Sequence, residues 1–326
     1  MNWFLLTLAC VILWSITDIL YKAVSPHNDP LSPHKTFVWI GIVMALAGGI
    51  MSSWSNTLLD SIKTVKDDLL YLVPLGLVYA AALFFGLLGK KHLAASIVSS
   101  LENTGGAFVA IIIYYYYLLT GYILPSYEFG VIDFIATVSI IVGVILLGKE
   151  EQALFKQELH LEEDKKEHPL GALALFFPII YTLIDVFSVA EIGGTSGNSG
   201  ITDAADEIFI PAMDFFIFEC GGIALVSICV WLYLLIVKKY VYNPFQPEEF
   251  IRCSAAMGET FGTMTFILAA AINPVLTAPI TSFHCILTIV LARIFLNERL
   301  SKKQYISLGF VVLGIVLIGF ADIFGL

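Results

Sequence analysis

The chain has 326 residues, of which 58% are hydrophobic and only 13% are charged, and its formal net charge at pH 7 is −10. A soluble protein of this length carries about a quarter charged residues, so this chain has too little polar surface to cover a globule in water. Composition therefore excludes a soluble globular protein and predicts that lipid surrounds most of the chain. The acidic balance also excludes a basic nucleic-acid-binding surface.

Ten apolar runs are long enough to cross a bilayer, which needs about 20 apolar residues per helix. They span approximately 3–23, 36–55, 70–88, 93–118, 130–148, 169–190, 208–237, 251–272, 275–296 and 304–323. The first run has neither a basic segment before it nor a cleavage site after it, which predicts a retained helix and not a signal peptide. The predicted fold is an all-α integral membrane protein with ten transmembrane helices.

The runs divide into two halves around a charged segment. Residues 1–148 form a first predicted five-helix repeat, residues 149–168 a charged cytoplasmic linker, and residues 169–326 a second five-helix repeat. Lysine and arginine concentrate in the loops and helix ends that are cytoplasmic if both termini lie outside the plasma membrane, among them Lys90 and Lys91. Because each repeat has five helices, the second enters the membrane from the opposite side, which predicts an inverted-topology pair.

A short pattern of an aromatic, a hydroxyl, two spacers and an acid occurs once in each half. Its copies are Trp14 to Asp18 and Tyr181 to Asp185. At nearly the same distance after each copy comes a glycine pair, in 143–148 and in 314–319. These matched positions predict that the chain contains an internal repeat.

The two acids of this pattern are expected about five residues from opposite faces of the membrane. At that depth Asp18 and Asp185 are predicted to be matched gates on either side of a cavity, and not central binding residues. Pro279 is expected to bend the ninth helix, which also suits a gate.

From Asn273 to Phe320 the chain has a helix with an interior proline, an Asn-Glu-Arg-Leu-Ser turn and a glycine-spaced final helix. This region resembles the closing helix pair of the drug/metabolite transporter superfamily, EamA type. The resemblance implies ten helices in two five-helix repeats. It also implies a central cavity lined by the first, third and fourth helices and by their counterparts, the sixth, eighth and ninth.

Three glutamates are predicted near the middle of the membrane, each within three residues of a glycine: Glu102, Glu219 and Glu259. A charged side chain at that depth is costly, so these acids are candidates for substrate or proton binding, against the alternative of helix packing with a neutral, hydrogen-bonded acid. His284 lies at a similar depth and is either part of a proton relay or a satisfied core residue. With no lysine or arginine expected there, the substrate is predicted to be cationic, zwitterionic or neutral.

Four further residues complete the predicted binding site. Asn103 directly follows Glu102, and the aromatic residues Trp14, Tyr79 and Tyr181 lie deep in their helices. These aromatic rings suit stacking or cation–π contact with a substrate, or else ordinary packing.

Together these features predict a secondary-active transporter that works by alternating access, with proton coupling. Its substrate is a small organic solute such as an amine, an amino acid or a cationic drug. Its other partners are protons and the lipid bilayer, with no nucleic acid, and the chain is a monomer or a homodimer. No metal, cofactor or enzymatic activity is expected, because Cys/His ligand spacing and the motifs of intramembrane hydrolases and ATPases are missing. The alternative is a non-transporting membrane scaffold or sensor on the same fold.

Overall fold

The structure is a computed structural model that describes residues 2–25, 29–55, 69–92, 95–102, 130–161, 205–297 and 301–324. These residues form α-helices and one 3₁₀ helix, with no strand among them, which confirms the predicted all-α class. The elements are α1 (Trp3–Ala23), α2 (Ser32–Ser55), α4 (Leu69–His92), α5 (Ala95–Glu102), α7 (Val131–Leu161), α10 (Ala205–Ile236), η1 (Pro247–Glu249), α11 (Phe250–Ile272), α12 (Pro274–Thr281), α13 (His284–Phe295) and α14 (Lys302–Phe324).

Four helices in the described part are long and apolar enough to cross a membrane. They are α1, residues Ser32–Ser53 of α2, residues Phe215–Ile236 of α10, and α11. This finding fits the predicted membrane protein. The count of ten helices stays a prediction, because most of the fourth run and all of the sixth lie outside the described residues.

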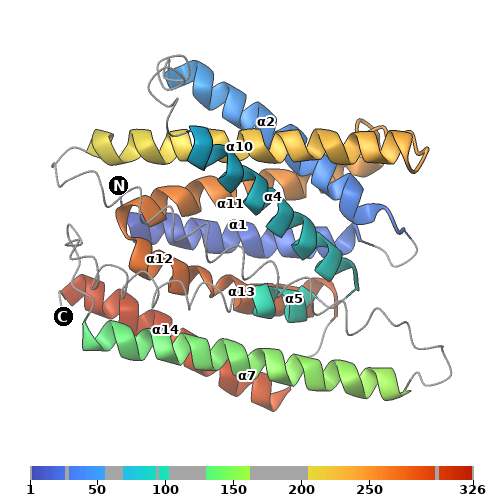
Figure 1. The fold of residues 1–326 in the computed structure, drawn as a ribbon. Coiled ribbons are helices and arrows are strands. Elements are labelled where there is room, and N and C mark those ends of the chain that lie inside the picture. Colours follow the sequence, from blue (N-terminus) through green and yellow to red (C-terminus); the bar gives the residue numbers. More distant parts are fainter. Residues whose placement is uncertain are drawn as a thin grey trace.

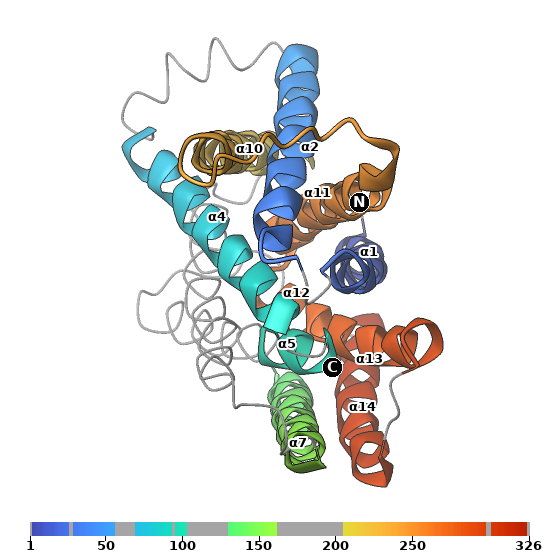
Figure 2. The same ribbon diagram turned by 90° about the vertical axis from the view of Figure 1, so that its right-hand side faces the viewer.

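The helices lie in layers, with α2 and α10 on one side, α1 and α11 in the middle, and α12, α13 and α5 beyond them (Figures 1 and 2). Helices α7 and α14 form the far side. Helix α4 runs obliquely from α10 to α5 and so crosses the layers. Its last turn is thereby placed beside α5 and the middle layer.

Glycines on α11 allow α1 to approach closely. A methyl group on Gly258 would overlap Thr17 Oγ1, and one on Gly262 would lie 2.6 Å from Trp14 Nε1. Small residues four apart on one helix face are a common means of close helix packing in membranes. The packing brings the polar face of α1 directly against Glu259 of α11.

The contact between α7 and α14 is reciprocal. A methyl group on Gly143 would lie 2.8 Å from the carbonyl oxygen of Ser307, and one on Gly314 would lie 2.6 Å from the carbonyl oxygen of Ala136. Each glycine thus lies against the residue seven positions before the other glycine. A self-complementary contact of this kind is what a two-fold relation between two helices produces.

The predicted ninth helix consists of two helices, and its break is not where the sequence analysis expected a bend. Helix α12 continues past Pro279 to Thr281, and the break falls at Ser282 and Phe283. There the backbone makes hydrogen bonds of three-residue spacing, such as Phe283 N to Ile280 O at 3.0 Å. A proline removes a hydrogen bond to the turn before it, so Pro279 does not itself end the helix at this point.

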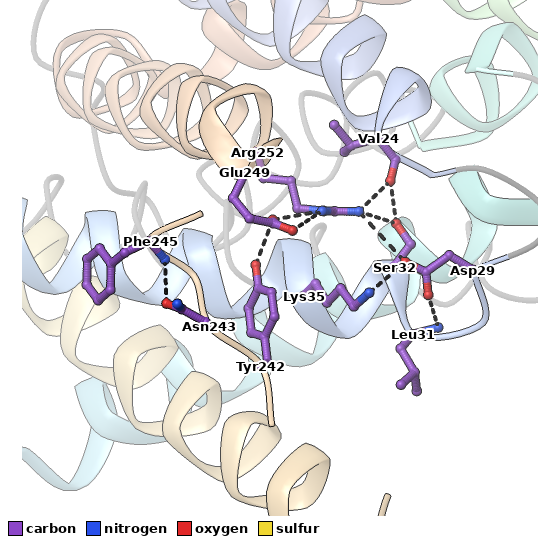
Figure 3. Close-up of polar contacts among 10 residues, drawn as sticks. All are labelled: Val24, Asp29, Leu31, Ser32, Lys35, Tyr242, Asn243, Phe245, Glu249 and Arg252. Atoms are coloured by element: carbon purple, nitrogen blue, oxygen red, sulfur yellow. Dashed lines mark hydrogen bonds and ion pairs between the residues drawn. The ribbon is translucent and has the colours of Figure 1, made fainter. Parts of the chain in front are cut away.

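A polar cluster, here called the Arg252 clasp, joins the end of α1, the start of α2 and the start of α11 (Figure 3). Arg252 donates from Nη1 to both carboxylate oxygens of Glu249 at 2.7 Å, and from Nη2 to the carbonyl oxygen of Val24 at 2.9 Å and to Ser32 Oγ at 3.3 Å. Tyr242 donates to Glu249 at 2.8 Å. The clasp closes this end of the bundle through charge-assisted hydrogen bonds.

The loop groups around the clasp have shifted pKa values. Burial and the neighbouring Glu249 carboxylate raise the pKa of Tyr242. The pKa of Asp29 is lowered: burial opposes the shift, but hydrogen bonds from Lys35 and from the backbone N–H of Leu31 outweigh it. Both shifts favour the protonation states that keep the clasp intact near neutral pH.

Candidate functional site: a buried ionisable cluster

Five helices enclose a cavity of about 30 Å³ inside the bundle. Helices α1 and α4 contribute most of its lining, and α5, α11 and α13 contribute one ionisable residue each. The lining residues are Trp14, Asp18, Tyr21, Leu83, Gly86, Leu87, Lys90, Glu102, Glu259 and His284. The volume suffices for a water molecule or two, whereas pockets that bind organic ligands measure about 300–1,000 Å³.

Lys90 is at the centre of one half of this cluster. Its Nζ lies 3.1 Å from Asp18 Oδ1 and 2.8 Å from Glu102 Oε2. The three side chains are only 8%, 6% and 5% exposed. Ions removed from water to this extent are stable only when they are paired, and here one ammonium serves two carboxylates.

His284 begins α13 directly after the helix break and faces Asp18. Its Nε2 lies 3.3 Å from Asp18 Oδ2, and its Nδ1 lies 3.2 Å from the carbonyl oxygen of Thr281. The hydroxyl of Ser15 donates to the carbonyl oxygen of His284 at 3.1 Å and so holds the start of α13 against α1. Thr288 also donates to Asp18 Oδ2, at 3.2 Å.

The two ring nitrogens of His284 each face an oxygen atom, Nε2 the carboxylate of Asp18 and Nδ1 the carbonyl group of Thr281. Which nitrogen donates depends on the tautomer of the ring. His284 and Asp18 thus form a buried imidazole–carboxylate pair, which is the kind of pair that proton shuttles use.

Glu259 is the acid of the other half, and it is held by phenols. Tyr21 donates to Glu259 Oε2 at 3.2 Å, and Tyr79 to Oε1 at 3.5 Å. No lysine or arginine of the described residues lies within ion-pairing distance of Glu259, although it is 6% exposed. The indole of Trp14 lies against Gly262, one turn after Glu259 in α11, and 5.7 Å from the ring of His284. Its Nε1 has no hydrogen-bond partner in the described part of the chain.

The structure brings together several residues that the sequence analysis selected separately. Glu102, Glu259, His284 and Trp14 all line the cavity, and Tyr79 contacts it through Glu259. Glu219 does not join them: it is buried in α10 and lies beside Gly76 of α4, away from the cavity. Asn103, Tyr181 and Asp185 lie outside the described residues.

Asp18 lies among the acids that were predicted to be central, and not apart from them, while its role as a gate stays a prediction. Asp18 shares the ammonium of Lys90 with Glu102 and therefore belongs to the same cluster. Depth counted along one helix did not predict this contact, because it depends on how the last turns of α1 and α4 meet, where Lys22 Nζ donates to the carbonyl oxygen of Lys90 at 3.1 Å. The expectation that no lysine lies among the acids is wrong for the same reason.

Sequence reasoning missed Lys90 and Tyr21, although a signal for each was present. The cavity-facing residues of α4 are Leu83, Gly86, Leu87 and Lys90, which follow one helix face at intervals of three and four. The apolar run was ended before the two lysines because they are charged, but the helix and its inward face continue to His92. Tyr21 occupies the same face of α1 as Trp14 and Asp18.

No family model and no curated protein matches this chain. One solved crystal structure, described only as that of a protein, resembles it with a TM-score of 0.57 at 12% sequence identity. The match covers 97% of this chain and 96% of the other. A likeness at this identity shows the fold alone. Fold and site thus define a helical protein with apolar helices of membrane-spanning length around a buried cluster of ionisable residues.

Proposed function

We propose that the chain is a secondary-active transporter of the plasma membrane that exchanges a small organic cation or zwitterion for protons by alternating access. The observation that carries the proposal is the buried contact of His284 with Asp18, inside a cluster in which Lys90 pairs with Asp18 and Glu102 while Glu259 has no cation at ion-pairing distance among the described residues. An amine, an amino acid or a cationic drug has the charge that such a site lacks.

The cost of the cluster supports a functional role. Burying ions among apolar helices is unfavourable, and replacing a buried ion pair with well-packed apolar residues is often neutral or stabilising. Asp18, Lys90, Glu102 and Glu259 are all buried, and they come from four different helices. Packing alone gives no reason to place four such groups at one point.

The helix break supports transport in particular. Discontinuous helices at the substrate site are a recurrent feature of secondary transporters, because the free helix ends interact with ions and substrates. The break at Ser282 and Phe283 directly precedes His284. The reciprocal contact of Gly143 and Gly314 agrees with two inverted five-helix repeats, so the proposal includes ten helices of the drug/metabolite transporter type with both termini outside.

The small cavity implies a closed conformation. A space of about 30 Å³ does not admit an organic solute, so the helices around it must move apart during transport. The Arg252 clasp joins α1, α2 and α11 at one end of the bundle, where these helices begin or end. In this proposal it closes one of the two paths to the cavity.

Uptake into liposomes tests the proposal. Purified protein is reconstituted into acid-loaded liposomes, and the uptake of radiolabelled amines and amino acids is compared with and without the pH gradient. The wild-type protein is expected to accumulate a cationic or zwitterionic solute at the expense of the proton gradient. Glu259→Gln is expected to lower the protein-dependent initial rate about tenfold, which corresponds to about 1.4 kcal/mol.

Two controls separate this result from leakage. Diffusion of weak bases is the same in protein-free liposomes and is subtracted. Glu150→Gln changes a glutamate that pairs with the exposed Lys303 away from the cavity, and it should transport like the wild type. Solutes that raise the melting temperature but never accumulate would instead favour the scaffold or sensor.

A further inference from the structure

Tyr21 divides the buried cluster into two halves. Its ring lies 5.8 Å from Lys90 Nζ, measured to the ring centroid, and its hydroxyl donates to Glu259 at 3.2 Å. One half, here called the lysine half, holds Asp18, Lys90 and Glu102. The other, the aromatic half, holds Glu259 with the rings of Tyr21, Tyr79 and Trp14.

The lysine half contains a complete ammonium site that is already filled. Lys90 Nζ has a carboxylate oxygen at 3.1 Å, another at 2.8 Å, and the ring of Tyr21 nearby. Two carboxylates and an aromatic face are also what would bind the ammonium group of a free primary amine. The lysine side chain reaches this point from the last turn of α4 and occupies the space that such a ligand would need.

The aromatic half also offers a carboxylate and aromatic rings to a cation, but none of its described side chains is a lysine or an arginine. Glu259 is buried, and among the described residues it receives only hydrogen bonds from Tyr21 and Tyr79. The indole of Trp14 lies against Gly262, one turn after Glu259 in α11, and 5.4 Å from the ring of Phe266, so an apolar surface continues along α11 from the acid. An ammonium group with an apolar body fits this half once the cavity widens.

We infer that Lys90 is a tethered ammonium that fills the second of two cation subsites and thereby makes the cavity selective for monoamines over diamines. The inference rests on the proposed function, because it concerns the same cavity. A monoamine places its single charge against Glu259. The second ammonium of a diamine meets Lys90, and two like charges in a buried site repel each other strongly.

Binding of one matched pair of ligands tests the inference. Pentylamine and 1,5-diaminopentane have the same carbon chain and differ by one ammonium group. Their affinities for the full-length protein in detergent are measured by calorimetry at constant ionic strength. The wild type is expected to bind pentylamine more tightly. Lys90→Met is expected to bind 1,5-diaminopentane at least about tenfold more tightly than the wild type does, because Asp18 and Glu102 then accept its second ammonium.

Lys91→Met is the matched control. Lys91 is the next residue of α4 and is as buried as Lys90, at 8% exposed, but it does not line the cavity. This variant should keep the wild-type preference for pentylamine. Lys90→Arg, which retains the charge, should also show no gain in diamine binding.

A second variant covers the case in which Lys90→Met does not fold. The double variant Asp18→Asn/Lys90→Met removes one charge of each sign and leaves Glu102 and Glu259 as two acids for one diamine. The same gain in 1,5-diaminopentane affinity is expected from it.

Three kinds of result would overturn the inference, and they differ in what they say of the transporter. Variants that bind pentylamine but gain no affinity for 1,5-diaminopentane, or a wild type that binds both equally, refute the role of Lys90 and leave the proposed function standing. If neither the wild type nor any variant binds either amine, while an amino acid is still transported, the amine subsites fail and the transporter does not. If no solute is bound or transported, both proposals fail.

Discussion

The buried acids Asp18 and Glu259 are contacted by side chains from distant parts of the chain. Asp18 is contacted by Lys90 from α4 and by His284 and Thr288 from α13. Among the described residues, Glu259 receives side-chain hydrogen bonds only from the phenols of Tyr21 in α1 and Tyr79 in α4. The two acids therefore differ in their partners, although both are buried in one cavity, and this difference underlies the division of roles proposed above.

The clasp offers a test at the scale of one residue, through the pKa of Tyr242. Because its folded-state pKa is raised above the unfolded value of about 10, the stabilisation from this phenol is fully present below pH 10 and is lost as the pH rises further. The melting temperature of the wild type is expected to fall more steeply above pH 10 than that of Tyr242→Phe.

Thermal unfolding between pH 8 and pH 11 measures this difference. Tyr240→Phe is the control, because Tyr240 belongs to the same loop but is exposed. It should follow the wild-type curve. Parallel curves for Tyr242→Phe and the wild type would show that the Tyr242 phenol contributes no such stabilisation.

At the scale of the element, the close approach of α1 and α11 determines the geometry of the site. The helices contact each other through Gly258 and Gly262, and this contact brings Tyr21 within hydrogen-bonding distance of Glu259. A larger residue at either glycine separates the two helices. Stability and ligand binding are thereby linked through one helix interface.

Gly262→Ala tests this link. The added methyl group would lie 2.5 Å from Trp14 Cδ1 and 2.6 Å from Nε1, and a rigid indole cannot yield without moving the helix. Overpacking of this kind costs about 1–3 kcal/mol, so both the melting temperature and the affinity for amines should fall.

Gly221→Ala in α10 is the control, because a methyl group there meets nothing within 4 Å in the described residues. It should be neutral or slightly stabilising, since alanine favours a helix over glycine by up to about 1 kcal/mol. Unchanged amine binding in Gly262→Ala would mean that the spacing of α1 and α11 does not control the site.

At the scale of the whole molecule, the two halves of the chain meet in a reciprocal way. The glycine pairs that the sequence analysis matched between the halves supply the α7–α14 contact, with Gly143 against α14 and Gly314 against α7. Two equivalent positions in a self-complementary contact should have equivalent energies.

Gly143→Ala and Gly314→Ala are therefore expected to destabilise the protein by similar amounts, about 1–3 kcal/mol each, since both methyl groups would meet backbone carbonyl oxygens. Thermal unfolding in detergent measures both. Gly309→Ala, in α14 but facing open space within the described part, should be nearly neutral. A large effect at one matched glycine and none at the other would contradict the two-fold relation.

The apolar helices and several residues of the cavity could be predicted from the sequence, because polar groups are costly in lipid and therefore stand out in apolar runs. Glu102, Glu259, His284 and Trp14 could be found in this way. The two repeats stay a prediction. The three-dimensional arrangement was needed to show that Asp18 and Lys90 belong with them and that the predicted ninth helix breaks before His284. Hydropathy predicts how deep a residue lies along its own helix. An ion pair depends instead on where the ends of two different helices meet, which the hydropathy of one helix does not give. From the sequence, Lys90 was expected in a loop. It can be buried because carboxylates from α1 and α5 pair with its ammonium group.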